Sequence, residues 1–189
     1  MRLESSIIWK KCGKSIQFKI LKQRIWKYNQ IIHQVGRMRV NILAIGKNRQ
    51  GVFRELYEFY VKRIQWDIQL IEFETQKTQN WKKQRLEETK KLVSSVPKGS
   101  PVVILDETGK LVSSREFSGW IGEHLDNGAR NISFLIGGSY GLDPSAINSS
   151  DLVFSFGRVT WPHLMIRGMV AEQLYRAQQI LKNHPYHRD

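Results

Sequence analysis

The sequence predicts an α/β fold in which a parallel sheet is flanked by helices on both faces. Three observations support this prediction. Short apolar runs of strand length alternate along the chain with longer segments whose apolar residues recur at helical spacing. Two of the runs, 101–105 and 131–136, have the nearly continuous apolar character of strands buried on both faces. At 189 residues, the chain is long enough for one domain with a sizeable core.

The first predicted elements follow residue 38. Residues 39–45 are mostly apolar and end at a Gly-Lys-Asn sequence, which predicts a strand and a turn. Helical spacing predicts a helix over 51–63, and alternation predicts a strand over 66–73. Residues 80–95 are highly charged and predict a solvated helix. Its expected apolar anchors are Trp81, Leu86 and Leu92.

The same alternation continues to the end of the chain. Residues 101–105 predict a buried strand, and 106–109 predict a turn. Ser113 and Glu116 have the spacing of a capping box, which predicts a helix to about Leu125. The remaining predicted elements are a strand over 131–136, a short helix after Pro144, a strand over 151–156 and a long helix after Pro162. The apolar stripe of this last helix is Ile166, Met169, Val170, Leu174, Ala177 and Leu181.

Charge and composition narrow the class of partner. The formal charge of +13 favours a polyanion, nucleic acid before a membrane surface. One cysteine excludes a disulfide framework and a cysteine-rich zinc module, and it favours a reducing compartment. No run of about 18 apolar residues occurs, so no membrane span is expected.

The charge is concentrated in residues 1–37, which hold nine Lys or Arg residues and one acid. We therefore expect a basic extension over 1–37 and a working domain over 38–189. Three interpretations of the extension stay open. It is an RNA-binding arm whose aromatic residues stack on bases, an organellar targeting peptide, or the product of a start assigned upstream of Met38.

Three predicted strand ends are unusual, and ligands of parallel sheets bind beyond such ends. One of them, Leu105-Asp106-Glu107, carries two acids. Gly137, Gly138 and Gly141 permit close backbone approach, but the turn lacks the Gly-Lys-Ser/Thr of a phosphate-binding loop. Residues 156–161 are short, mostly apolar and free of carboxylates, so they can enclose an adenine or serve as a plain core connection.

The final residues combine an aromatic ring, two imidazoles and a guanidinium. His184 and His187 lie only three residues apart around a proline, with no carboxylate or thiolate cluster to complete a metal site. No metal is expected. An RNA contact fits these residue types better, because Tyr and His stack on bases and Arg binds phosphate.

Several short motifs occur in one order, and together they resemble one family. They are Met38–Lys47, Leu135-Ile136-Gly137-Gly138 with Gly141-Leu142, Thr160 with Pro162-His163, Glu172–Ala177, and the terminal His184-Pro185-Tyr186-His187-Arg188. The set resembles the small SPOUT methyltransferases that modify N3 of a pseudouridine in large-subunit ribosomal RNA. The resemblance covers residues 38–189. It implies an α/β sheet with a C-terminal trefoil knot, a rare exception to unknotted chains.

The resemblance also implies ligands and partners. The cofactor would be S-adenosylmethionine, the enzyme a cytoplasmic homodimer whose sites are completed by the partner subunit, and the substrate a ribosomal stem-loop read in the assembled ribosome. An organellar location follows instead if 1–37 are a targeting peptide. Two alternatives are a SPOUT methyltransferase acting on another RNA, such as transfer RNA, and a non-catalytic ribosome-binding module.

The family's functional positions carry over onto this sequence. The implied cofactor-binding residues are Leu105, Gly137, Phe156, Gly157, Arg158, Val159, Thr160 and Trp161. The implied catalytic residues near the target base are Glu172, Tyr186, His187 and Arg188. Ser139-Tyr140 and Trp161 depart from residues common in the family, on the expected pocket wall.

Chemistry suggests a role for each of the catalytic residues. His187 is the expected acceptor of the N3 proton, because its ordinary pKa lies near neutrality. Glu172 either accepts that proton, orients His187 or Arg176, or forms a plain ion pair with Arg176 one turn away. Arg188 is expected on a phosphate or a uracil carbonyl, and Tyr186 on the base.

Overall fold

The computed structural model describes residues 38–75 and 78–187. In this part of the chain, five parallel strands form one sheet in the order β2-β1-β4-β3-β5. The strands are β1 (Arg39–Ile45), β2 (Asp67–Phe73), β3 (Val102–Leu111), β4 (Asn131–Ile136) and β5 (Leu152–Ser155). The helices are α2 (Val52–Val61), α3 (Trp81–Ser94), α4 (Ser114–Asp126), α5 (Pro144–Asn148) and α6 (His163–Leu181). The predictions for residues 1–37 and for Arg188 lie outside the described residues.

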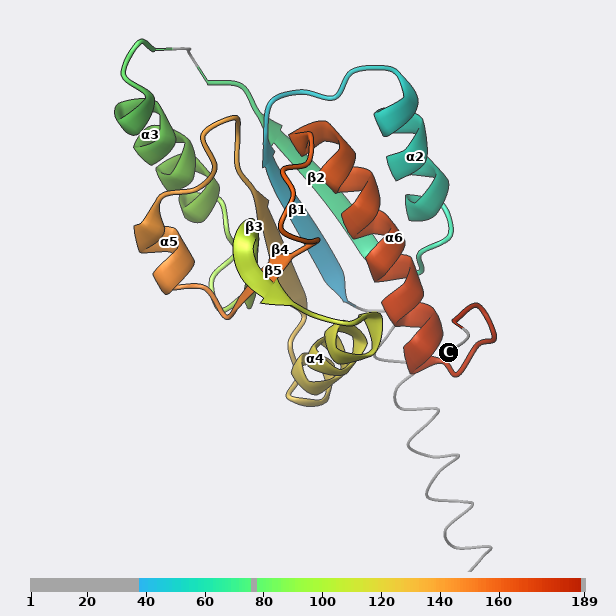
Figure 1. Cartoon of the computed structure of the whole chain (residues 1–189). Helices are drawn as coiled ribbons and strands as arrows, with labels where there is room; N and C mark the ends of the chain where they lie inside the picture. The colour runs from blue at the N-terminus through green and yellow to red at the C-terminus, as the bar shows by residue number, and fades with distance from the viewer. Residues whose placement is uncertain (1–37, 76–77, 188–189) are drawn as a thin grey trace, which may run out of the picture. The chain divides into compact units, whose positions relative to one another are not determined.

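Helices cover both faces of the sheet, as the alternating pattern predicts (Figure 1). Helices α3 and α5 lie on one face, and α2, α4 and α6 lie on the other. Leu43, Ile104 and Leu135 of the sheet pack with Leu92 of α3 in a fully buried cluster. On the opposite face Phe117 of α4 meets two sheet aromatics, with ring centroids 6.1 Å from Phe134 and 5.1 Å from Phe154.

Local signals place several element ends correctly. The predicted capping box is present at the start of α4: the Glu116 amide donates to the Ser113 hydroxyl at 3.2 Å, and the Ser113 amide donates to the Glu116 carboxylate at 2.7 Å. Helix α6 buries Val170, Leu174 and Ala177 of the predicted stripe. It approaches α2 so closely that a Cβ on Gly168 would lie 2.7 Å from the Leu56 side chain.

Two details of the prediction are wrong. Residues 106–109 do not form a turn, because β3 continues to Leu111 and its pairing with β5 resumes at Lys110 after a register shift. On α3, Trp81 and Leu86 are exposed at 44% and 37%. Leu92 is buried as predicted, and the helix also buries Gln84, Glu88 and Thr89. The burial of Glu88 is possible because the Gln84 amide and the Thr75 hydroxyl donate to its carboxylate at 2.9 and 2.7 Å.

The topology gathers two loops and the outer half of β3 at one edge of the sheet. Because all strands are parallel, their carboxyl ends lie on the same side, and β4, β3 and β5 are neighbours there. The loops after β4 and β5 therefore meet the outer half of β3. This edge is the place where parallel α/β sheets bind ligands.

Candidate functional site

A cavity of about 670 Å³ lies at the carboxyl ends of β3, β4 and β5. Its size falls within the range of roughly 300–1,000 Å³ for small-molecule sites. Seven of the eight residues predicted to bind the cofactor line it: Leu105, Gly137, Phe156, Gly157, Val159, Thr160 and Trp161. Arg158 is the eighth, and it is not among the lining residues. Residues as far apart in sequence as Leu105 and Trp161 thus meet at one place.

The glycine turn after β4 is required by close packing. A Cβ on Gly137 would lie 2.8 Å from the backbone carbon of Gly141, and one on Gly138 would lie 2.7 Å from a carboxylate oxygen of Glu88. Gly141 itself has a φ of +68°, a conformation that L side chains rarely adopt. The cavity wall here is therefore bare backbone, which lets a ligand approach closely.

The extension of β3 gives the cavity an acidic rim. Asp106 accepts hydrogen bonds from the amide and hydroxyl of Thr108 at 2.9 and 2.6 Å. The Thr160 hydroxyl donates to the Glu107 carboxylate at 2.9 Å, which ties the loop after β5 to β3. Both carboxylates line the cavity. Because the sequence predicts a turn over 106–109, it does not indicate that these carboxylates stand on a strand. It does show the acidic residues themselves.

The C-terminal residues form a second cluster on α6. Arg176 forms an ion pair with Glu172, and its Nε donates to the same carboxylate at 2.9 Å. The Tyr186 hydroxyl donates to Glu172 at 3.4 Å, and the Tyr186 ring packs edge-on against Tyr175 at 4.7 Å. Arg176 Nη1 lies 3.4 Å from His187 Nδ1. The predicted residues Glu172, Tyr186 and His187 therefore form one cluster, because Arg176 contacts both Glu172 and His187, and Tyr186 contacts Glu172.

Two groups of this cluster, Tyr186 and Arg176, have raised pKa values. Partial burial and the neighbouring Glu172 raise the pKa of Tyr186 to about 12, so the phenol remains a donor at neutral pH. The hydrogen bond from Arg176 to Glu172 raises the pKa of the guanidinium further. Because arginine only donates, the Nδ1 of His187 is the acceptor in their contact, and a neutral ring carries its proton on Nε2.

The two clusters lie at different points along α6. The helix begins at the cavity, where His163 and Ile166 are lining residues. Glu172 follows His163 by about two and a half turns, or roughly 14 Å along the axis. Glu172, Tyr186 and His187 are not among the residues that line the cavity.

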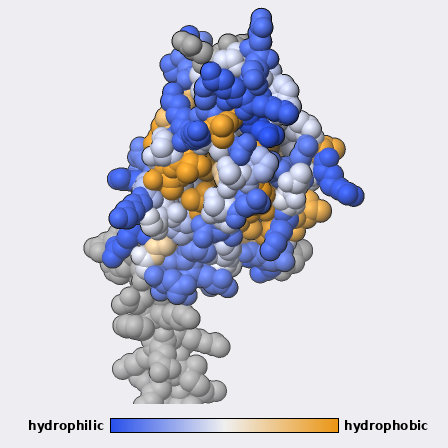
Figure 2. Space-filling view, turned by 90° about the vertical axis from the view of Figure 1, so that its left-hand side faces the viewer, coloured by the Kyte–Doolittle hydropathy of each residue, from blue (hydrophilic) through white to orange (hydrophobic). Residues whose placement is uncertain are grey.

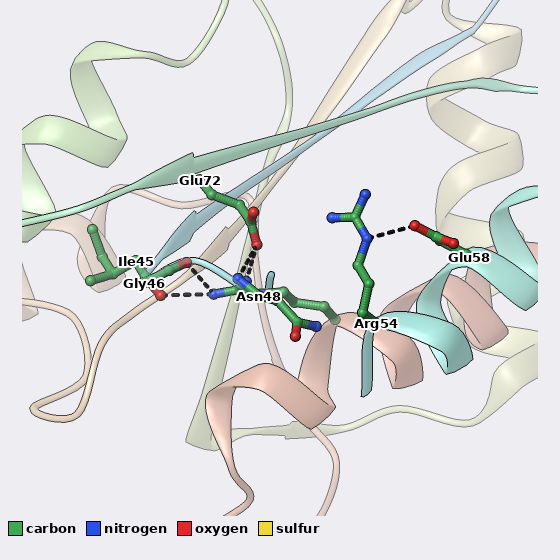
Figure 3. Close-up of polar contacts among 7 residues, drawn as sticks. Ile45, Gly46, Asn48, Arg54, Glu58 and Glu72 are labelled. Carbon is green, nitrogen blue, oxygen red and sulfur yellow. Dashed lines mark hydrogen bonds and ion pairs between the residues drawn. The ribbon is translucent and has the colours of Figure 1, made fainter. Parts of the chain in front are cut away.

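A buried arginine, Arg167, anchors the start of α6 to Ile45, Gly46 and Glu72, which Figure 3 labels. Arg167 has a fully buried side chain, forms an ion pair with Glu72 of β2, and donates from Nη2 to the carbonyls of Ile45 and Gly46, each at 2.8 Å. Burial lowers the pKa of Arg167, and Glu72 offsets part of that effect. The sequence prediction missed this residue. The feature that could have indicated it is the position of a single arginine directly after Ile166, near the start of a helix with an apolar stripe.

His163 lies beside this anchor and faces the cavity. A Cβ on Gly46 would lie 3.4 Å from His163 Nε2, so β1 ends close to the ring. Burial and the positive charge of Arg167 lower the pKa of His163, and Glu88 opposes them. The imidazole is therefore neutral at physiological pH. The sequence assigned this residue only to the entry of the last helix.

Two other kinds of site are absent from the described residues. Among residues 38–75 and 78–187, no group of three or more His, Cys, Asp or Glu side chains is placed to hold a metal ion. No helix in this part of the chain is both long and apolar enough to cross a membrane.

Comparison with known proteins defines the class. A family model described as "Predicted SPOUT methyltransferase" matches residues 38–187, so the chain belongs to the SPOUT methyltransferase family. Residues 1–37 lie outside the matched segment.

Curated relatives share a more particular name, ribosomal RNA large subunit methyltransferase H. The protein from Rhodospirillum centenum is 42% identical over 151 residues, which are 80% of this chain and 99% of that protein. The relative from Paramagnetospirillum magneticum is 38% identical over the same shares. The relative from Methylocella silvestris is 39% identical over 80% of this chain and all of that protein.

Proposed function

We propose that this protein methylates N3 of a pseudouridine in large-subunit ribosomal RNA, with S-adenosylmethionine as methyl donor. One observation carries the proposal. The chain matches almost the whole length of relatives named as ribosomal RNA large subunit methyltransferases, and it places a ligand-sized cavity where the family resemblance puts the cofactor. The proposal includes a homodimer with a knotted C-terminal region that acts on the ribosome in the cytoplasm.

The cavity has the character that this cofactor needs. Apolar side chains such as Leu105, Phe156 and Val159 can enclose an adenine, and the bare backbone at Gly137 can meet its polar edge. Asp106 and Glu107 place negative charge at the rim, which suits a ligand with a sulfonium and an ammonium group. When bound, S-adenosylmethionine supplies an electrophilic methyl group.

The remaining task of the protein is to place the target nitrogen and remove its proton. In the proposal His187 accepts the N3 proton. Its Nδ1 lone pair faces Arg176, so uptake of a proton at Nδ1 requires their 3.4 Å contact to open. Glu172 is held by Arg176, Gln173 and Tyr186, which favours a positioning role over a role as base. Tyr186 packs on the uracil ring, and Arg188 binds a phosphate or carbonyl.

The separation of the two clusters supports a shared active site. Within one protomer the cavity and the Glu172–Arg176 pair lie at different turns of α6. In the proposed dimer, the C-terminal residues of one protomer reach the cavity of its partner. A mixed dimer of one Val159→Arg chain and one His187→Ala chain then regains activity at one of its two sites, because Val159 is an exposed residue of the cavity wall and an arginine there repels a sulfonium. Either homodimer alone is inactive.

The direct test uses the purified full chain, labelled S-adenosylmethionine and ribosomes that lack the modification. The expected product is methyl label on a large-subunit pseudouridine. Label confined to transfer RNA instead assigns the alternative of a SPOUT enzyme with another substrate. A chain that binds ribosomes but shows no heat of binding with S-adenosylmethionine is the non-catalytic module. Both results overturn the proposal.

A further inference from the structure

An aromatic and basic surface borders the cavity without belonging to the proposed cofactor set. It consists of Trp81, Lys82 and Arg85 at the start of α3 and Tyr140 in the loop after β4; we call it the Trp81 patch. Tyr140 and Arg85 also line the cavity, so the patch is continuous with its mouth. Trp81 does not line the cavity, which makes it separable from cofactor binding.

The two rings of the patch are partly exposed to solvent. Trp81 is 44% exposed and Tyr140 is 46% exposed, although large aromatic side chains are usually buried. Their centroids lie 6.3 Å apart with the ring planes tilted by 40°, so the rings do not close into a stack on each other. Arg85 and Lys82 lie over the Trp81 ring at 5.3 and 5.5 Å from its centroid.

The helix that carries Trp81 is rich in positive charge, and two of its cations lie over the Trp81 ring. Helix α3 carries the cations Lys82, Lys83, Arg85, Lys90 and Lys91. Its two acids contribute little to the patch: Glu87 lies beside Lys83 at 3.9 Å, and Glu88 is buried beneath Gly138. Arg85 is 3.9 Å from Asp143, and its buried Nε has no hydrogen-bond partner among the residues that the structure describes. Figure 2 views the side of the molecule that bears α3 and α5, and hydrophilic side chains cover much of it.

We propose that the Trp81 patch binds an unpaired nucleotide that flanks the target base in the RNA. The inference rests on the proposed function for the choice of RNA. Proteins bind single strands by combining aromatic rings, on which bases stack, with cations that track the phosphates, and the patch provides both beside the cavity mouth. A second copy of this chain is a poorer occupant, because a two-fold contact would set the cations of α3 against their own copies.

The test measures binding of a fluorescein-labelled, single-stranded dodecamer of uridine by anisotropy, using the full chain throughout. Trp81→Ala is expected to weaken binding by about 5- to 100-fold, the effect of losing one stacked base. Trp81→Phe keeps most of the affinity, because it retains a stacking face. Lys82→Gln lowers the slope of log Kd against log salt by roughly 0.7. The matched control is Val93→Ala, an exposed apolar residue at the other end of α3, which leaves the affinity unchanged.

Two further measurements separate this inference from its alternatives. The affinity of Trp81→Ala for S-adenosylmethionine stays at the wild-type value, since Trp81 lies outside the cavity. Wild-type affinity of Trp81→Ala for the dodecamer overturns the inference, as does a shift of its monomer–dimer equilibrium in sedimentation, which assigns the patch to a subunit interface. Neither result affects the proposed function, which fails only if the wild-type chain leaves ribosomes unmethylated.

Discussion

Replacing Arg167 tests whether the buried ion pair holds the cavity-forming end of the sheet together. Arg167→Met keeps the length of the side chain but removes the charge partner of Glu72 and the donor to two carbonyls of β1. Breaking a buried pair by removing one partner costs about 3–5 kcal/mol. For a domain of this size each kcal/mol shifts Tm by about 2–4 °C, so we expect Tm to fall by about 6–20 °C.

The assay is thermal and urea unfolding followed by circular dichroism, with Arg54→Met as the matched control. Arg54 pairs with Glu58 one turn away on α2, and both partners are partly exposed (Figure 3). Such pairs contribute less than about 1 kcal/mol. Arg167→Met with Glu72→Leu recovers much of the lost stability, because no charge is left without a partner. A loss for Arg167→Met no larger than for Arg54→Met, or a double variant as unstable as the sum of the single ones, refutes the reasoning.

Three further predictions concern the site. Gly138→Ala forces a Cβ against Glu88 and destabilises the fold by about 1–3 kcal/mol in urea titrations, whereas Gly119→Ala, with open space around its Cβ, does not. Because the pKa of His163 is lower in the folded chain than its ordinary 6.5, unfolding takes up a proton as the pH falls below that value. Stability therefore declines there, and His163→Asn, compared in urea at pH 5 and 7.5, declines less. His187→Ala lowers the single-turnover methylation rate by about 10²–10⁴-fold; an unchanged rate excludes it as the base.

Most of the fold follows from short-range patterns. Apolar runs, helical spacing and the Ser113–Glu116 box act within a few residues, so the sequence alone placed the strands and helices in order. The errors arose where distant contacts override local preference. Pairing with β5 overrides the local turn preference at Asp106, and Thr75, 13 residues away, donates to one oxygen of the buried Glu88 carboxylate.

The residues of the site likewise divide into those that the sequence could indicate and those that depend on distant contacts. The unusual strand ends could be recognised in the sequence, but their assignment to a cofactor pocket came from the family resemblance. The roles of Arg167 and Arg85 depend on partners up to 122 residues away, such as the Ile45 carbonyl, and no local pattern reports them. Trp81 was expected in the core because aromatic residues usually lie there. Its exposure beside cations is visible only in three dimensions.

The positions of a few side chains are a better guide to RNA recognition than the net charge of the chain. Nine of the 30 cations lie in residues 1–37, outside the segment matched by the family, which leaves 30 − 9 = 21 cations against 17 − 1 = 16 acids. Many of these 21 face carboxylates, as Arg39 faces Asp67 and Lys47 faces Glu74, and such cations release few counterions from RNA. Lys82 instead lies over a tryptophan ring beside the cavity. If the Trp81 patch binds the strand, a single neutral substitution there alters the salt dependence more than the loss of any paired cation.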